Sequence, residues 1–246
     1  MKINNCRNCN KKKLQPLFSL GKISFTGKFP KINQKIKKAP LEVVMCKHCK
    51  LVQLAHKFNL KYLYGPDYGY RSSISNTMVS HLKNVSNNLK KKTKLKQKEM
   101  VLDIASNDAT LLKFYPSNVI TFGIDPLINK YQKEYKKINH KISDFFSISK
   151  IKKKTKNKFK IITALSVFYD LEKPNKFLKE VENLLDKNGI FALEFADLSS
   201  IINKNMFDTI CHEHLEYYSS KIIIDMCKKN NLKVIDILKN NINGSS

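Results

Sequence analysis

Short apolar runs alternate with amphipathic segments over the second half of this sequence, and this alternation restricts the fold more than any other feature. The runs have the length of buried strands and lie at residues 100–105, 119–124, 159–167 and 190–195, with a shorter one around Ile142. The amphipathic segments suit helices and lie at residues 110–115, 127–137 and 174–185. Strands that alternate with helices in this way predict an α/β fold with a doubly wound, mainly parallel sheet.

Three further expectations complete the α/β region. The helix that begins near Pro174 should end at the Asn188-Gly189 pair, because glycine often follows the last turn of a helix. Residues 219–230 are expected to form a helix, and residues 232–238 are expected to form a last strand.

Residues 1–98 lack this alternation and predict two other regions. Prolines and glycines interrupt residues 1–60 repeatedly, so we expect residues 1–65 to form a small, loop-rich module. Residues 66–98 begin with aromatic side chains and continue with a helix from Ser75 to Leu89, and we expect a linker on the substrate side. Residues 99–246 then form the α/β domain.

Two Cys-x-x-Cys pairs lie in the N-terminal module, formed by Cys6 with Cys9 and by Cys46 with Cys49. A tight turn brings two thiolates at this spacing to one side, so two pairs can complete a tetrahedral zinc site. A closed four-sulfur site has no open position, which predicts a structural zinc. The alternatives are reduced thiols without metal or a redox pair. His48 lies inside the second pair and is expected to be a neighbour of the site rather than a ligand.

The chain has a formal net charge of +26, which by itself favours nucleic-acid binding. Only Arg7 and Arg71 are arginines, however, and arginine makes the bidentate contacts to phosphate and guanine. We therefore favour solvated lysine side chains over a nucleic-acid partner as the interpretation of the charge.

Neither a membrane span nor a signal peptide is expected. No apolar run approaches the ~20 residues that cross a bilayer, and the first ten residues have no apolar stretch after their first charge. Together with paired cysteines, which favour a reducing compartment, these features predict a cytoplasmic protein.

An acidic turn follows the first strand of the α/β domain, from Asp103 to Thr110. Doubly wound sheets bind ligands beyond the carboxyl ends of their strands, where the strand order reverses. The turn has neither Gly-x-Gly-x-x-Gly nor Gly-Lys-Ser/Thr, so we expect neither a pyrophosphate-binding loop nor a P-loop. It suits a ligand with a cationic centre and no phosphate, and S-adenosylmethionine (SAM) fits that description.

The acidic residues at successive strand ends complete this expected cofactor site. Asp125 would bond a ribose diol, and Asp144 with Phe145 would meet the adenine edge and face. For each Asp the alternative is a helix cap or a solvated turn. The residues expected to bind SAM are Asp103, Ala105, Ser106, Asn107, Asp108, Asp125, Pro126, Asp144, Phe145 and Ser166.

A second chemical stretch follows the fifth strand and contains His212-Glu213-His214. It is not the zinc-protease pattern, in which two histidines lie one helical turn apart. A histidine acting as a general base is the favoured interpretation, because its ordinary pKa of about 6.5 suits proton removal near neutrality. The alternatives are a second metal site, or surface histidines beside a glutamate that starts a helix.

With these residues the sequence resembles the SAM-dependent C-methyltransferases of deoxysugar biosynthesis, in order and over essentially its whole length. The matching motifs are the two cysteine pairs, Cys49-Lys50-Leu51-Val52-Gln53-Leu54, Tyr68-Gly69-Tyr70-Arg71-Ser72-Ser73, Ala105-Ser106-Asn107-Asp108, Gly123-Ile124-Asp125-Pro126, Phe207-Asp208-Thr209-Ile210-Cys211-His212-Glu213-His214 and Asn243-Gly244-Ser245-Ser246.

The resemblance implies a Rossmann-like class I methyltransferase that methylates C3 of a nucleotide-linked 4-keto-6-deoxyhexose. The ketone acidifies the neighbouring C–H bond, a base removes the proton, and the enolate carbon takes the methyl group. In this family the second histidine looks like the base, which assigns that role to His214. Glu213 would orient or bind, and Tyr70 would hold the sugar or the enolate oxygen.

Several positions depart from the family pattern. Cys211 stands where the family has Tyr, and Ser166-Val167-Phe168-Tyr169-Asp170 stands where it has Asn-Val-x-x-His, which makes Asp170 a candidate for the histidine's polar role. Ala109 replaces a usual Gly and is expected to need a negative φ. The family also continues into a C-terminal lobe that helps to bind the nucleotide-sugar, whereas this sequence stops at Ser246. We expect a fragment, a chain that relies on a separate partner, or an inactive protein.

Two other functions remain open from sequence. One is an RNA methyltransferase with a zinc module, favoured by the charge. The other is a degenerate, non-catalytic fragment that binds zinc and SAM.

Overall fold

The protein is described by a computed structural model over residues 1–28, 30–65 and 68–242, so the Asn243–Ser246 motif lies outside the described residues. Contacts within the chain divide it into two units, which we treat one at a time. The first unit contains Met1–Gly69, Ser166–Leu178 and Phe195–Ser246, and the second contains Tyr70–Leu165 and Lys179–Glu194. The domain boundaries expected at residues 65 and 98 stay a prediction.

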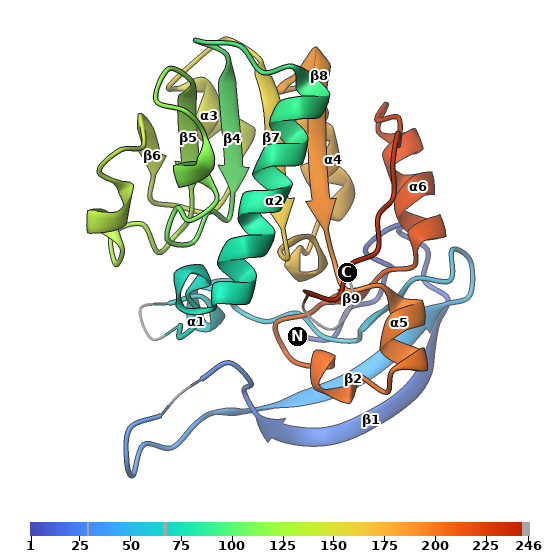
Figure 1. The fold of residues 1–246 in the computed structure, drawn as a ribbon. Helices are drawn as coiled ribbons and strands as arrows, with labels where there is room; N and C mark the ends of the chain where they lie inside the picture. The colour runs from blue at the N-terminus through green and yellow to red at the C-terminus, as the bar shows by residue number, and fades with distance from the viewer. Residues whose placement is uncertain (29, 66–67, 243–246) are drawn as a thin grey trace. The chain divides into compact units, whose positions relative to one another are not determined.

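A parallel five-stranded sheet forms the second unit, as the apolar runs predicted. Its strands are β4 (Met100–Ile104), β5 (Ile120–Ile124), β6 (His140–Ile142), β7 (Phe159–Leu165) and β8 (Leu185–Glu194). Their order in the sheet is β6-β5-β4-β7-β8, and every neighbouring pair is parallel (Figure 1). The chain moves outward from β4 in both directions, so the strand order reverses at β4 and β7.

The central strand β4 is buried at all five positions, which requires cover on both faces of the sheet. Figure 1 shows α2 (Asn76–Thr93) across one face and α3 (Ile148–Lys152) on the other. The predicted helix at 75–89 is thereby confirmed, and Ser75 caps it by accepting a hydrogen bond from the Met78 amide.

Two segments expected to be helical form only short 3₁₀ turns, η2 (Leu112–Phe114) and η3 (Gln132–Tyr135). In residues 127–137 the side chain of Asp125 takes the Leu127 amide, and the buried Tyr135 hydroxyl bonds Ser106 and Asn107. These polar contacts, together with the modest helix propensity of Asn and Tyr, replace a regular helix.

The prediction that a helix ends at Asn188-Gly189 was wrong. The helix α4 (Pro174–Glu182) stops earlier, and both residues lie inside β8. The register between β7 and β8 shifts beside them, and a Cβ on Gly189 would lie 2.8 Å from the Phe159 carbonyl oxygen. The glycine therefore serves a strand irregularity and a close backbone approach.

The strand expected at 232–238 is also absent from the described residues, which have no regular structure there. Ile235, Ile237 and Leu238 are all more than half exposed. Alternation of apolar residues predicts a strand only where a sheet edge can pair with it, and none of the described strands pairs with this segment.

An antiparallel four-stranded sheet forms the first unit, with the order β1-β2-β3-β9. Its strands are β1 (Leu14–Ser24), β2 (Lys38–Cys46), β3 (Val52–Leu54) and β9 (Glu216–Tyr217). The sequence predicted only loops in the N-terminal part, because most positions of β1 are exposed and its pairing with β2 shifts register twice. An exposed strand of this kind lacks the alternation of apolar and polar residues that identifies a half-buried strand.

The last strand of this sheet comes from far along the chain. β9 pairs with β3 through Val52 opposite Tyr217 and Gln53 opposite Glu216, and the Leu54 amide donates to the Leu215 carbonyl. The core below contains Leu41, Val43, Leu54, Leu215 and Tyr217. As a result, His212–His214 lie one residue before a strand of the sheet that contains Cys46.

Short helices complete the first unit: α1 (Leu60–Leu63), α5 (Leu198–Asn203) and α6 (Ser220–Lys229), with 3₁₀ turns η4 (Phe168–Asp170) and η5 (Phe207–Thr209). The position of α6 confirms the helix predicted at 219–230. Among the residues that the structure describes, none of the helices combines the length and the apolar character that a membrane span requires.

Arg7 and Glu216 form an ion pair inside the first unit, with 3.4 Å between Nε and Oε1 and almost no exposure of either side chain. The Arg7 guanidinium also donates to the Leu54 and His56 carbonyls at 2.6 and 2.7 Å.

Arg7→Met leaves the Glu216 carboxyl buried without its cation, so we expect the free energy of unfolding to fall by about 3–5 kcal/mol. Urea denaturation at fixed zinc measures it. Lys2→Met, which removes an exposed ion pair to Glu42, is the matched control and should change stability by less than ~1 kcal/mol; an equal effect of the two variants would contradict the prediction.

Candidate metal centre, cofactor turn and acid–base cluster

The four predicted cysteines meet in the first unit. The Sγ atoms of Cys6, Cys9, Cys46 and Cys49 all lie within 4.8 Å of one another, and the Cys6–Cys49 and Cys9–Cys46 pairs are 3.5 Å apart. A tetrahedral zinc with Zn–S bonds of about 2.3 Å separates its sulfurs by roughly 3.8 Å, so this cluster fits the ion. Within the described part of the chain, no second group of His, Cys, Asp or Glu has such a geometry.

Surrounding contacts support a closed, structural centre. Cys6 and Cys46 are buried, and the Gln53 side-chain amide donates to Cys6 Sγ at 3.2 Å. The same Gln53 accepts the Arg7 amide through Oε1, which ties β3 to the first cysteine pair. His48 is exposed and is not part of the cluster, in agreement with its predicted place beside the site.

Metal removal should therefore unfold the sheet of the first unit. We expect a strong chelator, or Cys46→Ser, to release one zinc per chain. The cooperative unfolding transition of the first unit should then disappear, because the free energy of metal binding at such sites contributes directly to the free energy of folding. Calorimetry with metal analysis measures both effects. Cys227→Ser, a buried cysteine outside the cluster, is the control and should keep one zinc. An unchanged transition in the metal-free protein would show that the centre is not structural.

The expected cofactor turn lies in the second unit, directly after β4 at the reversal of strand order. Three of its residues have left-handed backbone conformations, with φ of +60° at Ala105, +48° at Asn107 and +61° at Ala109. The expectation of a negative φ at Ala109 was wrong: the alanine keeps the conformation that suits the family's glycine, at a cost of roughly 1 kcal/mol. We call this turn glycine-type, because its backbone has left-handed conformations that glycine usually adopts.

Two of the acids expected at the cofactor are engaged within the protein. Asp103 is buried and accepts from the Thr163 hydroxyl at 2.6 Å. Asp108 is fully buried and accepts from Arg71 Nε, the Ser73 amide and the Thr110 hydroxyl. Burial would raise the pKa of Asp108, but these donors together hold it below its usual value. The side chains of Asp103 and Asp108 therefore stabilise the turn through hydrogen bonds within the protein.

Asp125 retains the capacity to bind hydroxyl groups. One of its oxygens accepts the Asn107 amide at 2.9 Å and the other accepts the Leu127 amide at 2.7 Å. A carboxylate has about four lone-pair sites, so two remain for a ribose diol. Burial raises the pKa of Asp125 to about 6. This acceptor, beside a glycine-type turn, fits SAM.

The remaining expected residues range from exposed to buried. Asp144 is exposed, pairs with Lys150 at 2.6 Å and accepts the Phe145 amide. Phe145 and Pro126 are half-buried. Ser106 is buried, with its hydroxyl 2.8 Å from that of Tyr135, and Ser166 follows β7 with a φ of +54°.

Sequence reasoning missed several residues that hold the turn. Arg71 links Asp108 to Glu134 at 3.0 and 2.9 Å, and the Ser72 amide donates to Asn107 Oδ1. The Tyr70 carbonyl accepts the Asn107 side-chain amide, while the Tyr70 side chain is 44% exposed. The only sequence signal was the Tyr70-Arg71-Ser72-Ser73 motif itself. Another missed pair is His81 on α2 with Glu194 at the end of β8, at 2.6 Å.

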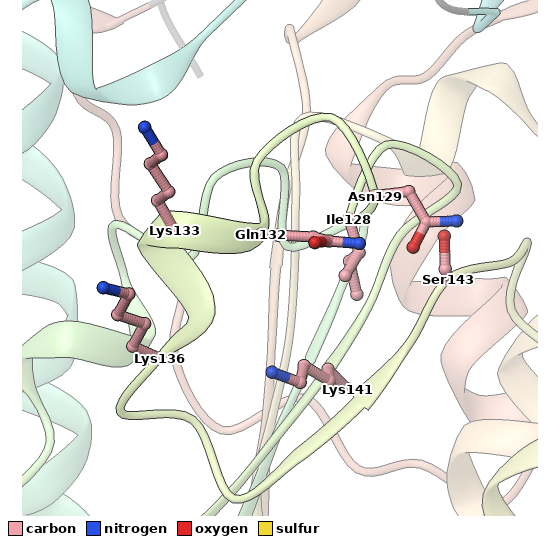
Figure 2. Close-up of a pocket in the computed structure, with 7 residues that line it drawn as sticks. All are labelled: Ile128, Asn129, Gln132, Lys133, Lys136, Lys141 and Ser143. Atoms are coloured by element: carbon pink, nitrogen blue, oxygen red, sulfur yellow. The ribbon is translucent and has the colours of Figure 1, made fainter.

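One pocket of about 440 Å³ also lies in the second unit (Figure 2). Its lining side chains are Ile128, Asn129, Gln132, Lys133, Lys136, Lys141 and Ser143. Figure 2 shows the amide of Asn129 beside the hydroxyl of Ser143, with Lys133 and Lys136 on the opposite side and Lys141 below them. None of the expected cofactor residues lines it, so it is separate from the turn.

The buried carboxyl of Asp103 makes stability depend on pH. Burial, assisted by the charge of Asp125, raises its pKa to about 7 from an unfolded value near 3.9. The folded state therefore holds a proton that the unfolded chain has lost between about pH 4 and 7, and stability falls as the pH rises through that range. Asp103→Asn cannot titrate, so its stability relative to wild type should increase by on the order of 3 kcal/mol from pH 4 to 7 in urea titrations. Parallel profiles for the two proteins would contradict this.

The two histidines of His212-Glu213-His214 have different environments in the first unit. His212 is fully buried; its Nδ1 accepts the Thr26 amide at 3.3 Å and its Nε2 donates to the Ala39 carbonyl at 3.2 Å. Both ring nitrogens are thus occupied by backbone groups. Burial lowers the pKa of His212, which keeps it neutral and structural.

His214 has one nitrogen anchored. Its Nδ1 donates to the Thr209 carbonyl at 2.7 Å, and its ring lies edge-on to Tyr169 with 4.4 Å between centroids. Nε2 then carries the lone pair of the neutral imidazole. Burial lowers the pKa of His214, although the Thr209 carbonyl and the charge of Glu213 oppose the shift. The arrangement gives a neutral base near neutral pH.

Two buried acids are sequence neighbours of His214 and of its ring partner Tyr169: Glu213 precedes His214, and Asp170 follows Tyr169. Glu213 is buried and accepts from the Thr26 hydroxyl. Asp170 accepts from the Tyr64 hydroxyl at 2.6 Å through Oδ2, while its buried Oδ1 has no hydrogen-bond partner. Burial, together with the charge of Glu213, raises the pKa of Asp170 well above its usual value. Burial likewise raises the pKa of the Cys211 thiol, so it is not a thiolate nucleophile.

Two family comparisons match this chain. Residues 77–237, more than half of the chain, match a family described as a methyltransferase domain. The chain belongs to this methyltransferase family. Residues 6–64 match a second family, described as a "putative zinc binding domain", and they include all four clustered cysteines. The cofactor of this methyltransferase fold is SAM, and its metal centre is a four-cysteine zinc site.

Sequence and structural relatives agree with that assignment. C-methyltransferase NovU of Streptomyces niveus is 24% identical over 211 residues, which are 84% of this chain and 50% of NovU. The chain therefore spans about half the length of this curated relative. A putative sarcosine dimethylglycine methyltransferase from Galdieria sulphuraria matches with a TM-score of 0.52 and 18% identity, over 66% of this chain and 65% of that chain. The YcgJ protein of Bacillus subtilis matches with a TM-score of 0.50 and 18% identity, over 66% and 73%. At such identities the structures share the fold alone.

Proposed function

We propose that the protein is a SAM-dependent C-methyltransferase that acts on a nucleotide-linked 4-keto-deoxysugar through a base-generated enolate. The observation that carries this proposal is the anchored neutral imidazole of His214, whose Nε2 is the basic atom. The similarity to a relative named as a C-methyltransferase supports carbon as the acceptor atom. Sugar methylation at a carbon requires such a base, because an alcohol C–H bond is not acidic and a C–H bond beside a ketone is.

The proposed step moves one proton from the substrate to the protein and one methyl group to the substrate. The proton on the carbon next to the ketone moves to His214 Nε2, and the electron pair of that C–H bond forms the enolate. SAM, when bound, supplies an electrophilic methyl group on a sulfonium. The enolate carbon would form the new C–C bond as the bond between that methyl group and sulfur breaks, which leaves the neutral thioether S-adenosylhomocysteine, and His214 would later release its proton to water.

The residues expected from the sequence would bind the reactants. Asp125 and the backbone of Ala105–Asp108 would hold SAM. Tyr70, with its partly exposed phenol, would hold the sugar or the enolate oxygen, and Glu213 would accept a sugar hydroxyl. Asp170 is the further candidate: a carboxyl kept protonated by burial can donate from its unpartnered oxygen to a developing oxyanion.

Deuterium exchange tests the proposal without depending on methyl transfer. A thymidine-diphosphate-linked 4-keto-6-deoxyhexose in D₂O, without SAM, should exchange the proton next to the ketone faster with the protein than alone. His214→Asn keeps a polar side chain but loses the basic nitrogen, so we expect the catalysed exchange to fall about 10²–10⁴-fold. NMR follows the signal directly.

The control variant is His48→Asn, which alters an exposed histidine and should keep the wild-type rate and one zinc per chain. Equal exchange rates for wild type and His214→Asn would remove His214 from the mechanism. No catalysed exchange by wild type would remove the enolate proposal as a whole.

A further inference from the structure

The connection between β1 and β2 reaches the acid–base cluster, although it belongs to the zinc-binding half of the first unit. Thr26 and Gly27 lie in this connection, which runs from Ser24 to Lys38. We infer that Thr26 and Gly27 are positioning residues that fix the Glu213 carboxylate for the substrate, an inference that rests on the function proposed above.

Thr26 makes hydrogen bonds to both residues that precede His214. Its hydroxyl donates to Glu213 Oε2 at 2.5 Å and accepts the His212 amide at 2.9 Å. Its own amide donates to His212 Nδ1 at 3.3 Å. One residue thus binds the backbone and ring of His212 and the carboxylate of Glu213 across 186 and 187 positions of sequence. Hydrogen bonds to a buried charged group are among the stronger ones in proteins.

Gly27 lies against the other oxygen of the same carboxylate. A Cβ built on Gly27 would stand 1.8 Å from Glu213 Oε1 and 3.0 Å from its Cδ, so no other residue fits there without moving Glu213. Gly27 also has a φ of +68°, which glycine adopts without strain. The carboxylate is therefore held between a hydroxyl donor and a glycine backbone.

An aromatic cluster holds the connection in place. Phe25 packs against the rings of His212, Phe58 and Tyr62 with centroid separations of 4.7, 5.4 and 5.1 Å. Phe58 also meets His212 edge-on at 5.1 Å. These contacts fix Thr26 and Gly27 on either side of Glu213 before any ligand binds. The N-terminal module thus does more than bind metal.

A matched pair of glycine variants tests the steric half of the inference. Gly21 has the same φ of +68° as Gly27, but a Cβ there meets nothing within 4 Å. Both Gly27→Ala and Gly21→Ala incur the backbone strain, whereas only Gly27→Ala displaces Glu213. We expect Gly27→Ala to lower catalysed deuterium exchange of the keto-sugar about ten-fold or more, and Gly21→Ala to stay within about two-fold of wild type.

Threonine variants test the hydrogen-bond half and do not depend on a steric clash. Thr26→Val, of nearly the same shape, should reduce the exchange rate about ten-fold, and Thr26→Ser, which restores the hydroxyl, should recover most of it. If Thr26 acts through Glu213, Thr26→Val combined with Glu213→Gln should be no slower than Glu213→Gln alone. Zinc content and melting temperature identify any variant that has failed to fold.

The outcomes separate this inference from the proposed function. Wild-type exchange with unaffected Gly27→Ala and Thr26→Val proteins would overturn the positioning role and leave the function standing. Additive effects of Thr26→Val and Glu213→Gln would also overturn it, since the two would then act independently. No wild-type exchange would overturn the proposed function, and the inference would fall with it.

Discussion

Two pairs of residues between β3 and β9 determine where the acid–base cluster lies. Val52 faces Tyr217 and Gln53 faces Glu216, so a strand near the end of the chain completes a sheet that begins at residue 14. Gln53 also donates to Cys6 Sγ and accepts the Arg7 amide. Hydrogen bonds and strand pairs therefore connect the zinc centre to β3 and β9, and His212–His214 lie one residue before β9. Structural zinc and candidate chemistry depend on one another through this sheet.

The two units contain different chemical groups. The second unit has a glycine-type turn after β4, braced by the buried carboxylates of Asp103 and Asp108, with Asp125 free to accept hydroxyl groups. The first unit supplies an anchored imidazole and several buried acids whose pKa values burial raises or whose oxygens lack partners. A neutral base together with the protonated carboxyl of Asp170 suits carbon-acid chemistry, because the imidazole can remove a proton and the carboxyl can donate to the resulting oxyanion.

Local patterns predicted what depends on local physics. The apolar runs predicted all five strands of the parallel sheet, and the cysteine spacing predicted the metal cluster, because burial of strands and tetrahedral ligation leave direct sequence signals. β1 left no such signal, because most of its side chains are exposed. Long-range partners were equally hidden: Thr163 behind Asp103, Arg71 behind Asp108 and Thr26 behind Glu213 lie 60, 37 and 187 positions away. His212 and His214 are chemically identical in sequence, and only their hydrogen-bond partners distinguish a structural ring from a candidate base.

The central claim is that a half-buried, neutral imidazole at position 214 removes a proton from carbon. The most direct measurement is the pH dependence of catalysed deuterium exchange at the carbon next to the ketone, without SAM. Because burial lowers the pKa of His214 below its ordinary value, the exchange rate should rise through one ionisation below about pH 6.5 and then remain constant through neutrality. A rate that keeps rising above pH 8, or that follows the same curve in His214→Asn, would contradict the account.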